Sequence, residues 1–152
     1  MGGRAALLPC FRLLLAALWA GSLWALGYVA APTAFGMLPS GLAGDVVGAL
    51  LARQAWIAVA CGVVLLGLVR FAPDLDAKRR RGLFIVIVAM LACALVVYLG
   101  LQPAMARLRE LAGPAGVRAS PYWTQFAVMH GVSQVVHLVE SVLGVVLVLK
   151  SR

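Results

Sequence analysis

A stripe of polar side chains runs along the last apolar segment of this 152-residue chain, from Phe126 to Leu147. At about 100° per residue of an α-helix, six polar side chains fall within an arc of roughly 120°, and the opposite arc is apolar. Imidazole, carboxyl, hydroxyl and amide groups can bind a small ion, move a proton or hold a polar solute. This stripe is therefore the first candidate for a functional site, and it comprises His130, Ser133, Gln134, His137, Glu140 and Ser141.

The segment that carries the stripe is otherwise typical of a helix surrounded by lipid. A charged residue at the centre of such a helix costs about 2.5–3.5 kcal/mol on insertion, and each Leu or Val returns roughly 0.3–0.6 kcal/mol. The many Val and Leu residues therefore permit insertion despite Glu140. Because His137 precedes Glu140 by three residues, the two can share a proton or a hydrogen bond, which lowers the cost of each. The stripe must face protein or water.

The composition indicates that lipid is the solvent for most of the chain. Hydrophobic residues make up 64% of the sequence and charged residues only 12%, whereas soluble domains carry roughly twice that charged fraction. Four stretches are long enough to cross a bilayer as helices, which takes about 20 residues. We therefore predict an all-α, integral membrane, up-down four-helix bundle that forms a single domain over residues 1–152. No clear internal repeat is visible, and the helices are expected at about residues 13–38, 45–69, 83–101 and 122–149.

The third span is followed by a segment of mixed character. Pro103 has no amide donor and should bend or restart the helix. Beyond it, apolar and charged residues alternate at helical spacing as far as about residue 111. This pattern predicts an amphipathic extension that lies along the outer face of the membrane. Its apolar side comprises Met105, Leu108 and Leu111, and its charged side Arg107, Arg109 and Glu110.

The distribution of Lys and Arg predicts the orientation. Most of these residues lie near the termini or in the loop between the second and third spans, where Lys78 begins a run of four basic residues. Cytoplasmic loops carry such an excess, so we expect both termini in the cytoplasm and the chain in the cell membrane, with the bacterial inner membrane as the favoured location. The net charge of +8 thus requires no nucleic-acid partner, and contact with anionic lipids follows.

Depth along the helices suggests which residues meet the stripe. Arg53 and His130 both lie roughly 12–13 Å from the outer ends of their spans. If the second and fourth helices are neighbours, a polar cavity forms in the outer half of the bundle. We expect Tyr28, Arg53, Gln54, Tyr98, Gln102, His130 and Gln134 to line it. The alternative is that these groups only join helices, through hydrogen bonds that average about 0.6 kcal/mol; ionisable groups inside a membrane favour a function instead.

No motif of a soluble enzyme is present. The chain has no Walker A loop, no GxSxG and no HExxH. Its cysteines, Cys10, Cys61 and Cys93, form no CxxC or Cys/His pair with metal spacing and are interpreted as small buried apolar residues. We therefore predict neither an enzymatic activity nor a cofactor.

Three functions are compatible with these patterns. The favoured one is a membrane module that binds or passes a small ion, proton, metal or polar solute. Its binding or relay residues would be Arg53, Tyr98, Gln102, His130, Ser133, Gln134, His137 and Glu140, and His130 is the candidate metal ligand, supported by Met129 and Met105.

The second function is a non-catalytic accessory or structural subunit that packs against a second copy or another membrane protein. The third is a haem or redox protein. His130 and His137 are roughly 10.5 Å apart along one helix, so they cannot both be axial ligands of one iron.

Several motifs are similar to those of a known family. The stretch WAGSLWALGYVAAPTAFGMLPSGLAGDVVGALL, the segment from Leu101 to Met105, and the fourth-helix pattern of Phe126, His130-Gly131, Ser133 and Leu138 resemble the transmembrane-protein-205-like family. That resemblance implies a four-helix membrane protein without established enzymatic activity or cofactor. The family often has Asn where this chain has His137, which favours His130 for a shared role. More distantly, the helical pattern is similar to copper-resistance D-type membrane proteins, in which His and Met handle soft metals.

Overall fold

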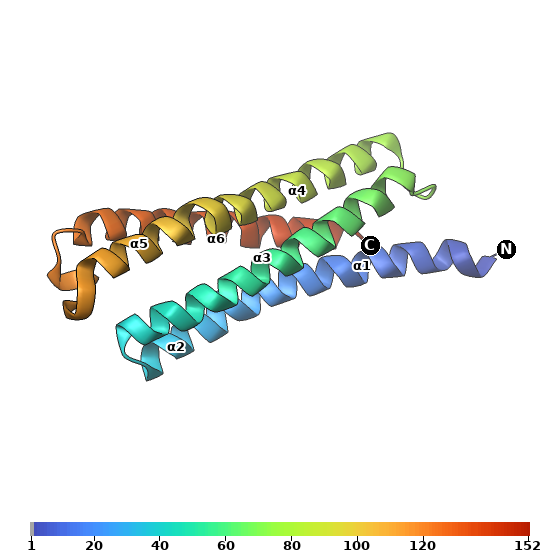
Figure 1. Ribbon diagram of the computed structural model, residues 1–152. Coiled ribbons are helices and arrows are strands. Elements are labelled where there is room, and N and C mark those ends of the chain that lie inside the picture. Colours follow the sequence, from blue (N-terminus) through green and yellow to red (C-terminus); the bar gives the residue numbers. More distant parts are fainter. Residues whose placement is uncertain (1) are drawn as a thin grey trace.

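The computed structural model describes residues 2–152, with side chains from residue 7 onward, and it forms a bundle of four long helical rods (Figure 1). The first rod is α1 (Gly2–Trp24), η1 (Ala25–Ala30) and α2 (Ala31–Met37). The second is α3 (Ser40–Phe71). The third is α4 (Ala77–Leu95), η2 (Val96–Leu101) and α5 (Gln102–Ala112), and two short turns, η3 (Gly113–Ala115) and η4 (Val117–Ala119), lead to the fourth, α6 (Trp123–Lys150).

All four rods are long and apolar enough to cross a membrane, so the predicted all-α, four-helix membrane bundle is confirmed. α1 packs against α3 and α6, and α4 packs against the same two helices. α3 and α6 therefore lie across the bundle from each other. The condition on which the predicted cavity depended, that the second and fourth helices are neighbours, is therefore not met. Residues of both helices nevertheless line one space at the centre of the bundle.

The first three rods begin earlier than the apolar stretches alone predict, at Gly2, Ser40 and Ala77, whereas the fourth begins at Trp123, close to its predicted start. Backbone hydrogen bonding continues past the hydrocarbon, where polar side chains are tolerated. α4 begins at Ala77 because Asp76 caps it, its carboxylate accepting the Arg79 N–H at 2.6 Å. The basic run from Lys78 to Arg81 is thus the first turn of a helix rather than a loop.

The predicted amphipathic extension exists as the helix α5. α5 continues the direction of α4 and η2 (Figure 1). Met105 and Leu108 are buried, whereas Leu111 is exposed. η2 is a π-helical segment that ends two residues before Pro103, and the changed hydrogen-bond register of such a segment can accommodate a residue without an N–H. The helix therefore passes the proline without turning aside.

The two halves of the chain are built alike. In each half, the first rod contains a six-residue π-helix, η1 or η2, and a proline follows it at the same interval, as Pro32 or Pro103. We call the rods up to Phe71 the first hairpin and the rods from Ala77 the second hairpin. Corresponding positions in their first rods are separated by 71 residues, as the starts of η1 and η2 at Ala25 and Val96 show. The sequence gives no clear sign of this relation.

The end of the bundle that holds both termini, the clamped end, is closely packed. Trp19, Leu65, Ile87 and Leu147 are fully buried there. Small residues allow close approach of the rods, since a Cβ added to Gly144 would touch Ala20 at 3.2 Å. Helices in lipid associate through such contacts.

An arginine fastens the clamped end. Arg12 is 1% exposed, and its guanidinium donates to both carboxylate oxygens of Asp74, at 3.0 and 3.4 Å, and to the Ser151 carbonyl at 3.4 Å. One side chain thus joins α1, the loop between the hairpins and the C-terminal residues. These hydrogen bonds hold the pKa of Asp74 below its usual value.

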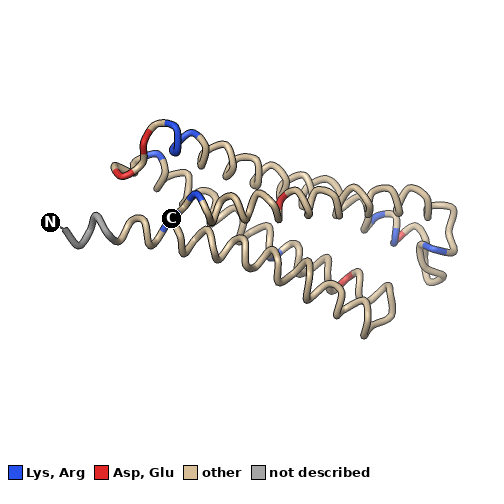
Figure 2. The backbone as a smooth tube through the Cα atoms, turned by 180° about the vertical axis from the view of Figure 1, so that it is seen from behind, with Lys and Arg blue, Asp and Glu red and all other residues tan. Residues whose placement is uncertain are grey.

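The opposite end, the open end, is different. There the pair α2 and α3 diverges from the pair α5 and α6 (Figures 1 and 2). The ion pair of Arg109 with Asp45 spans this gap at 3.8 Å, and Asp45 is largely exposed. This longer, solvated pair is a weak tie.

Asp74→Asn should destabilise the protein by about 1–3 kcal/mol, because it removes the charged partner of a buried guanidinium. Since the folded-state pKa of Asp74 is lowered, its contribution is complete at neutral pH and is lost as pH falls below about 4. Thermal unfolding in detergent at pH 7 and pH 3 should therefore show a larger difference between wild type and variant at pH 7. Asp45→Asn serves as the control and should change stability by under about 0.5 kcal/mol; equal effects of the two variants would contradict the role of the clamp.

Candidate functional site

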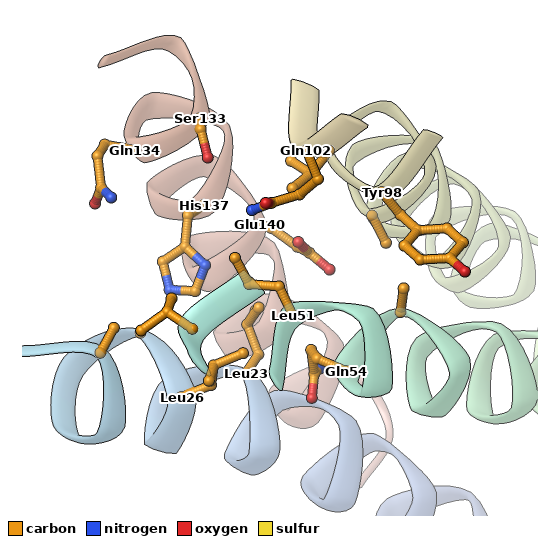
Figure 3. Close-up of a pocket in the computed structure, with 16 residues that line it drawn as sticks. Leu23, Leu26, Leu51, Gln54, Tyr98, Gln102, Ser133, Gln134, His137 and Glu140 are labelled. Atoms are coloured by element: carbon orange, nitrogen blue, oxygen red, sulfur yellow. The ribbon is translucent and has the colours of Figure 1, made fainter. Parts of the chain in front are cut away.

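A cavity of about 80 Å³ lies between the two hairpins, and Figure 3 shows the residues that line it. A water molecule needs about 10–15 Å³ of such space, so several would fit. All four rods contribute to its wall. The polar side chains of that wall are Gln54, Tyr98, Gln102, Ser133, Gln134, His137 and Glu140.

Glu140 is the acidic group of the cavity. It is 4% exposed, and its carboxylate points into the space between the rods (Figure 3). Ten residues separate it from the end of α6 at Lys150, so it lies roughly 15 Å from that end, near the middle of the span. Within residues 7–152, no Lys, Arg or His forms a salt bridge with it.

His137 lies one turn of α6 away from Glu140 and faces the first rod. Its half-buried ring packs directly on the backbone of η1 at Gly27, where a Cβ would overlap the imidazole. The Tyr28 ring meets it edge-on, with centroids 5.5 Å apart. Its Nε2 atom is buried and has no hydrogen-bond partner among the described residues. The absence of a side chain at Gly27 therefore leaves the space that the imidazole ring occupies.

A second buried nitrogen also lacks a partner. Gln54 of α3 is 7% exposed, lines the cavity and leaves Nε2 without a hydrogen bond in the described part of the chain. Buried polar groups are nearly always paired with protein or water. The unpaired Nε2 atom of Gln54, which lines the cavity, therefore indicates that the cavity holds water or a polar ligand. The unpaired Nε2 atom of His137 instead lies against Gly27.

The lining residues of the two hairpins correspond position by position. In the first rods, a constant spacing of 71 residues relates Leu23 to Ala94, Leu26 to Val97, Gly27 to Tyr98, and Ala31 to Gln102. In the second rods, a constant spacing of 86 residues relates Val47 to Ser133, Leu51 to His137, and Gln54 to Glu140. The cavity therefore lies where two structurally equivalent hairpins meet.

The chemistry of the two halves is nevertheless unequal. In the first hairpin, Gln54 is the one polar side chain of the lining, and the rest are aliphatic or Gly. The second hairpin contributes a phenol, an amide, a hydroxyl, an imidazole and a carboxyl at corresponding positions. The cavity thus has an apolar wall and a polar wall that face each other.

Two predicted site residues lie outside the cavity. Arg53 is exposed, because it precedes Gln54 and is rotated by about 100° to the outside of α3. His130 is also exposed and stacks on Phe126, with ring centroids 6.1 Å apart. It lies toward the open end, where the rods have already diverged. The expectation that Arg53 and His130 converge on one pocket is therefore wrong, and Tyr28 contributes only through its contact with His137.

The other predicted lining residues are brought together as expected. Gln54, Tyr98, Gln102 and Gln134 line the cavity, together with the stripe residues Ser133, His137 and Glu140. Sequence reasoning missed the aliphatic wall and Gly27, for which the only signal was a glycine within an apolar helix. Among the described residues, no group of three or more His, Cys, Asp and Glu side chains could hold a metal ion.

Comparison with known proteins gives a family but no activity. Residues 14–113 match a family model described as a domain of unknown function (DUF4149). The chain belongs to this family. The matched segment begins within α1, covers the rest of the first three rods and ends before α6. No curated protein and no solved structure matches the chain, and the resemblances to the transmembrane-protein-205-like and copper-resistance D-type families stay predictions.

Gly27→Ala should displace His137 and destabilise the protein by about 1–3 kcal/mol, since the added methyl group would overlap the imidazole. Gly21→Ala is the matched control in the same rod, because its Cβ would meet nothing within 4 Å. Alanine is the better helix former, so the control should be neutral or stabilising by up to about 1 kcal/mol. Thermal unfolding of both variants, with and without His137→Ala, tests this. If His137→Ala does not restore the stability of Gly27→Ala, the proposed contact is incorrect.

Proposed function

We propose that this multi-pass membrane protein binds a proton or a small cationic solute at Glu140 and passes it through the central cavity. The observation that carries the proposal is a buried carboxyl near mid-membrane that faces a space large enough for water and has no cationic partner among the described residues. An ionisable group inside a membrane is expensive, and such groups commonly belong to ion or proton pathways.

A purely structural role for the polar stripe is less well supported. Side chains that only join helices are expected to satisfy each other, because a partly satisfied buried network costs more than an apolar one. Here the buried Nε2 atoms of Gln54 and His137 and the Oγ atom of Ser141 have no partner in the described residues. Of these residues, Gln54 lines the cavity through a buried amide that is available to a ligand.

The surroundings of Glu140 favour binding over chemistry. The titratable groups near it are His137 of the same helix, Tyr98 of η2 and Cys93 of α4. From α1 and α3 it is faced by Trp19 and Gln54, which do not titrate. We assign no bond-making step to this set, so the proposed role is not enzymatic.

Access is proposed from the open end. A groove of about 350 Å³ between α3 and α5 shares Tyr98 and Gln102 with the cavity, and Arg109 and Asp45 lie along it. The clamped end is closed by the packed core and by Arg12. Passage would therefore require that end to loosen, whereas binding alone would not.

We also propose that both termini lie in the cytoplasm of a bacterial cell and that the chain resides in its inner membrane. The support is the excess of basic residues around the clamped end, where Arg70, Lys78 and Lys150 lie. A C-terminal reporter that is active only outside the cytoplasm should stay inactive; activity would reverse the orientation.

Glu140→Gln should reduce cation or proton flux into proteoliposomes at least about tenfold. The amide of glutamine does not ionise, so it can neither bind and release a proton nor attract a cation with a negative charge. Flux is followed with an internal pH dye under an imposed gradient. Glu110→Gln is the matched control, since Glu110 is exposed on α5 and lies outside the cavity. Equal flux in wild type, control and Glu140→Gln would rule out the proposed pathway.

A further inference from the structure

We propose that the ligand of the central cavity is a small amphipathic amine, held with its ammonium group on Glu140 and its apolar body against the first hairpin. The inference rests on the proposed function, because it assigns a class of ligand to the same site. It is carried by the contrast between the two walls of the cavity.

The polar wall determines the charged part of the ligand. Glu140, Ser133 and the Gln102 amide come from the second hairpin and line one side of the space. A carboxylate without a cationic neighbour is best matched by a cation that brings its own hydrogen-bond donors. An ammonium group has three such donors.

The apolar wall of the cavity determines the uncharged part of the ligand. Leu26, Val47 and Leu51 occupy positions that correspond to Val97, Ser133 and His137 of the second hairpin. A bare or hydrated metal ion would find few ligands on this side, since hard cations require about six oxygen atoms or more. An aliphatic group would instead gain the contact energy of apolar burial.

The size of the cavity limits the aliphatic group. An apolar cavity of about 150 Å³ holds benzene, and the space here is about 80 Å³. By that comparison the enclosed space holds about half of a benzene molecule, so a short branched chain such as that of isobutylamine would fill it and extend toward the open end. The divergence of the hairpins at the open end leaves the cavity accessible to a solute that partitions into the bilayer.

The test compares three small probes on the protein in nanodiscs by saturation-transfer NMR. Isobutylamine carries both the charge and the apolar body, isobutanol lacks the charge, and ethanolamine lacks the apolar body. We expect isobutylamine to bind at least about tenfold more tightly than either of the others. Glu140→Gln should remove this advantage over isobutanol, as expected for the loss of a buried charge partner.

Leu51→Asn provides an independent variant, because it makes the apolar wall polar at one position and leaves Glu140 unchanged. It should weaken isobutylamine binding about tenfold and leave ethanolamine binding unchanged or stronger. Leu50→Asn is the control, since Leu50 is exposed on the outside of α3 and does not line the cavity; its affinities should equal those of wild type.

Three outcomes would overturn the inference. Equal affinity for isobutylamine and ethanolamine, or no effect of Leu51→Asn, would show a cation site without an amphipathic preference. Absence of amine binding, together with proton flux that depends on Glu140, would overturn the ligand class and leave the proposed function standing. Loss of both the binding and the dependence of flux on Glu140 would overturn both.

Discussion

A carboxyl group in the middle of a lipid bilayer needs a proton, a cation or water beside it, and the arrangement around Glu140 follows from that need. Ionised and alone in hydrocarbon, such a group costs several kcal/mol. Here it projects from α6 into a space that four helices surround and that polar groups of the second hairpin border. The many aliphatic residues of α6 offset the free-energy cost of inserting this carboxyl group into the membrane. The cavity lowers the remaining cost, because it gives the carboxyl group polar surroundings at that depth.

The rest of the fold can be understood as the means of keeping that space open at one end and closed at the other. Arg12 and the packed core hold the clamped end together. Toward the open end the hairpins diverge, and the longer pair of Arg109 and Asp45 spans the gap. The two π-helical segments lie at the level of the cavity and direct Gly27 and Tyr98 toward it. Such segments are frequent at functional sites, and the prolines that follow them explain their position.

The spans and the polar stripe could be predicted because hydrophobic length and helical periodicity are local properties of the sequence. The partners of the stripe could not, because they depend on which rods are adjacent and how each is rotated. Arg53 and Gln54 illustrate this: one step along α3 separates a buried lining amide from an exposed guanidinium. Depth alone suggested that Arg53 and His130 meet, but α3 and α6 lie diagonally, and His130 belongs to the level where the bundle has widened. The equivalence of the hairpins could not be seen in the sequence, because corresponding positions such as Leu51 and His137 occupy equivalent places in the fold but carry chemically different side chains.

The proposed function requires that Glu140 is an ionisable group in a cavity that water can enter. Infrared difference spectroscopy on the protein in lipid, between acidic and alkaline pH, tests it most directly, since a protonated carboxyl has its own C=O stretching band. The account predicts a band that disappears on raising the pH, that is absent in Glu140→Gln and that persists in Glu110→Gln. A spectrum that is identical in Glu140→Gln and wild type would contradict it, because the carboxyl would then not titrate and the cavity would not be open to protons.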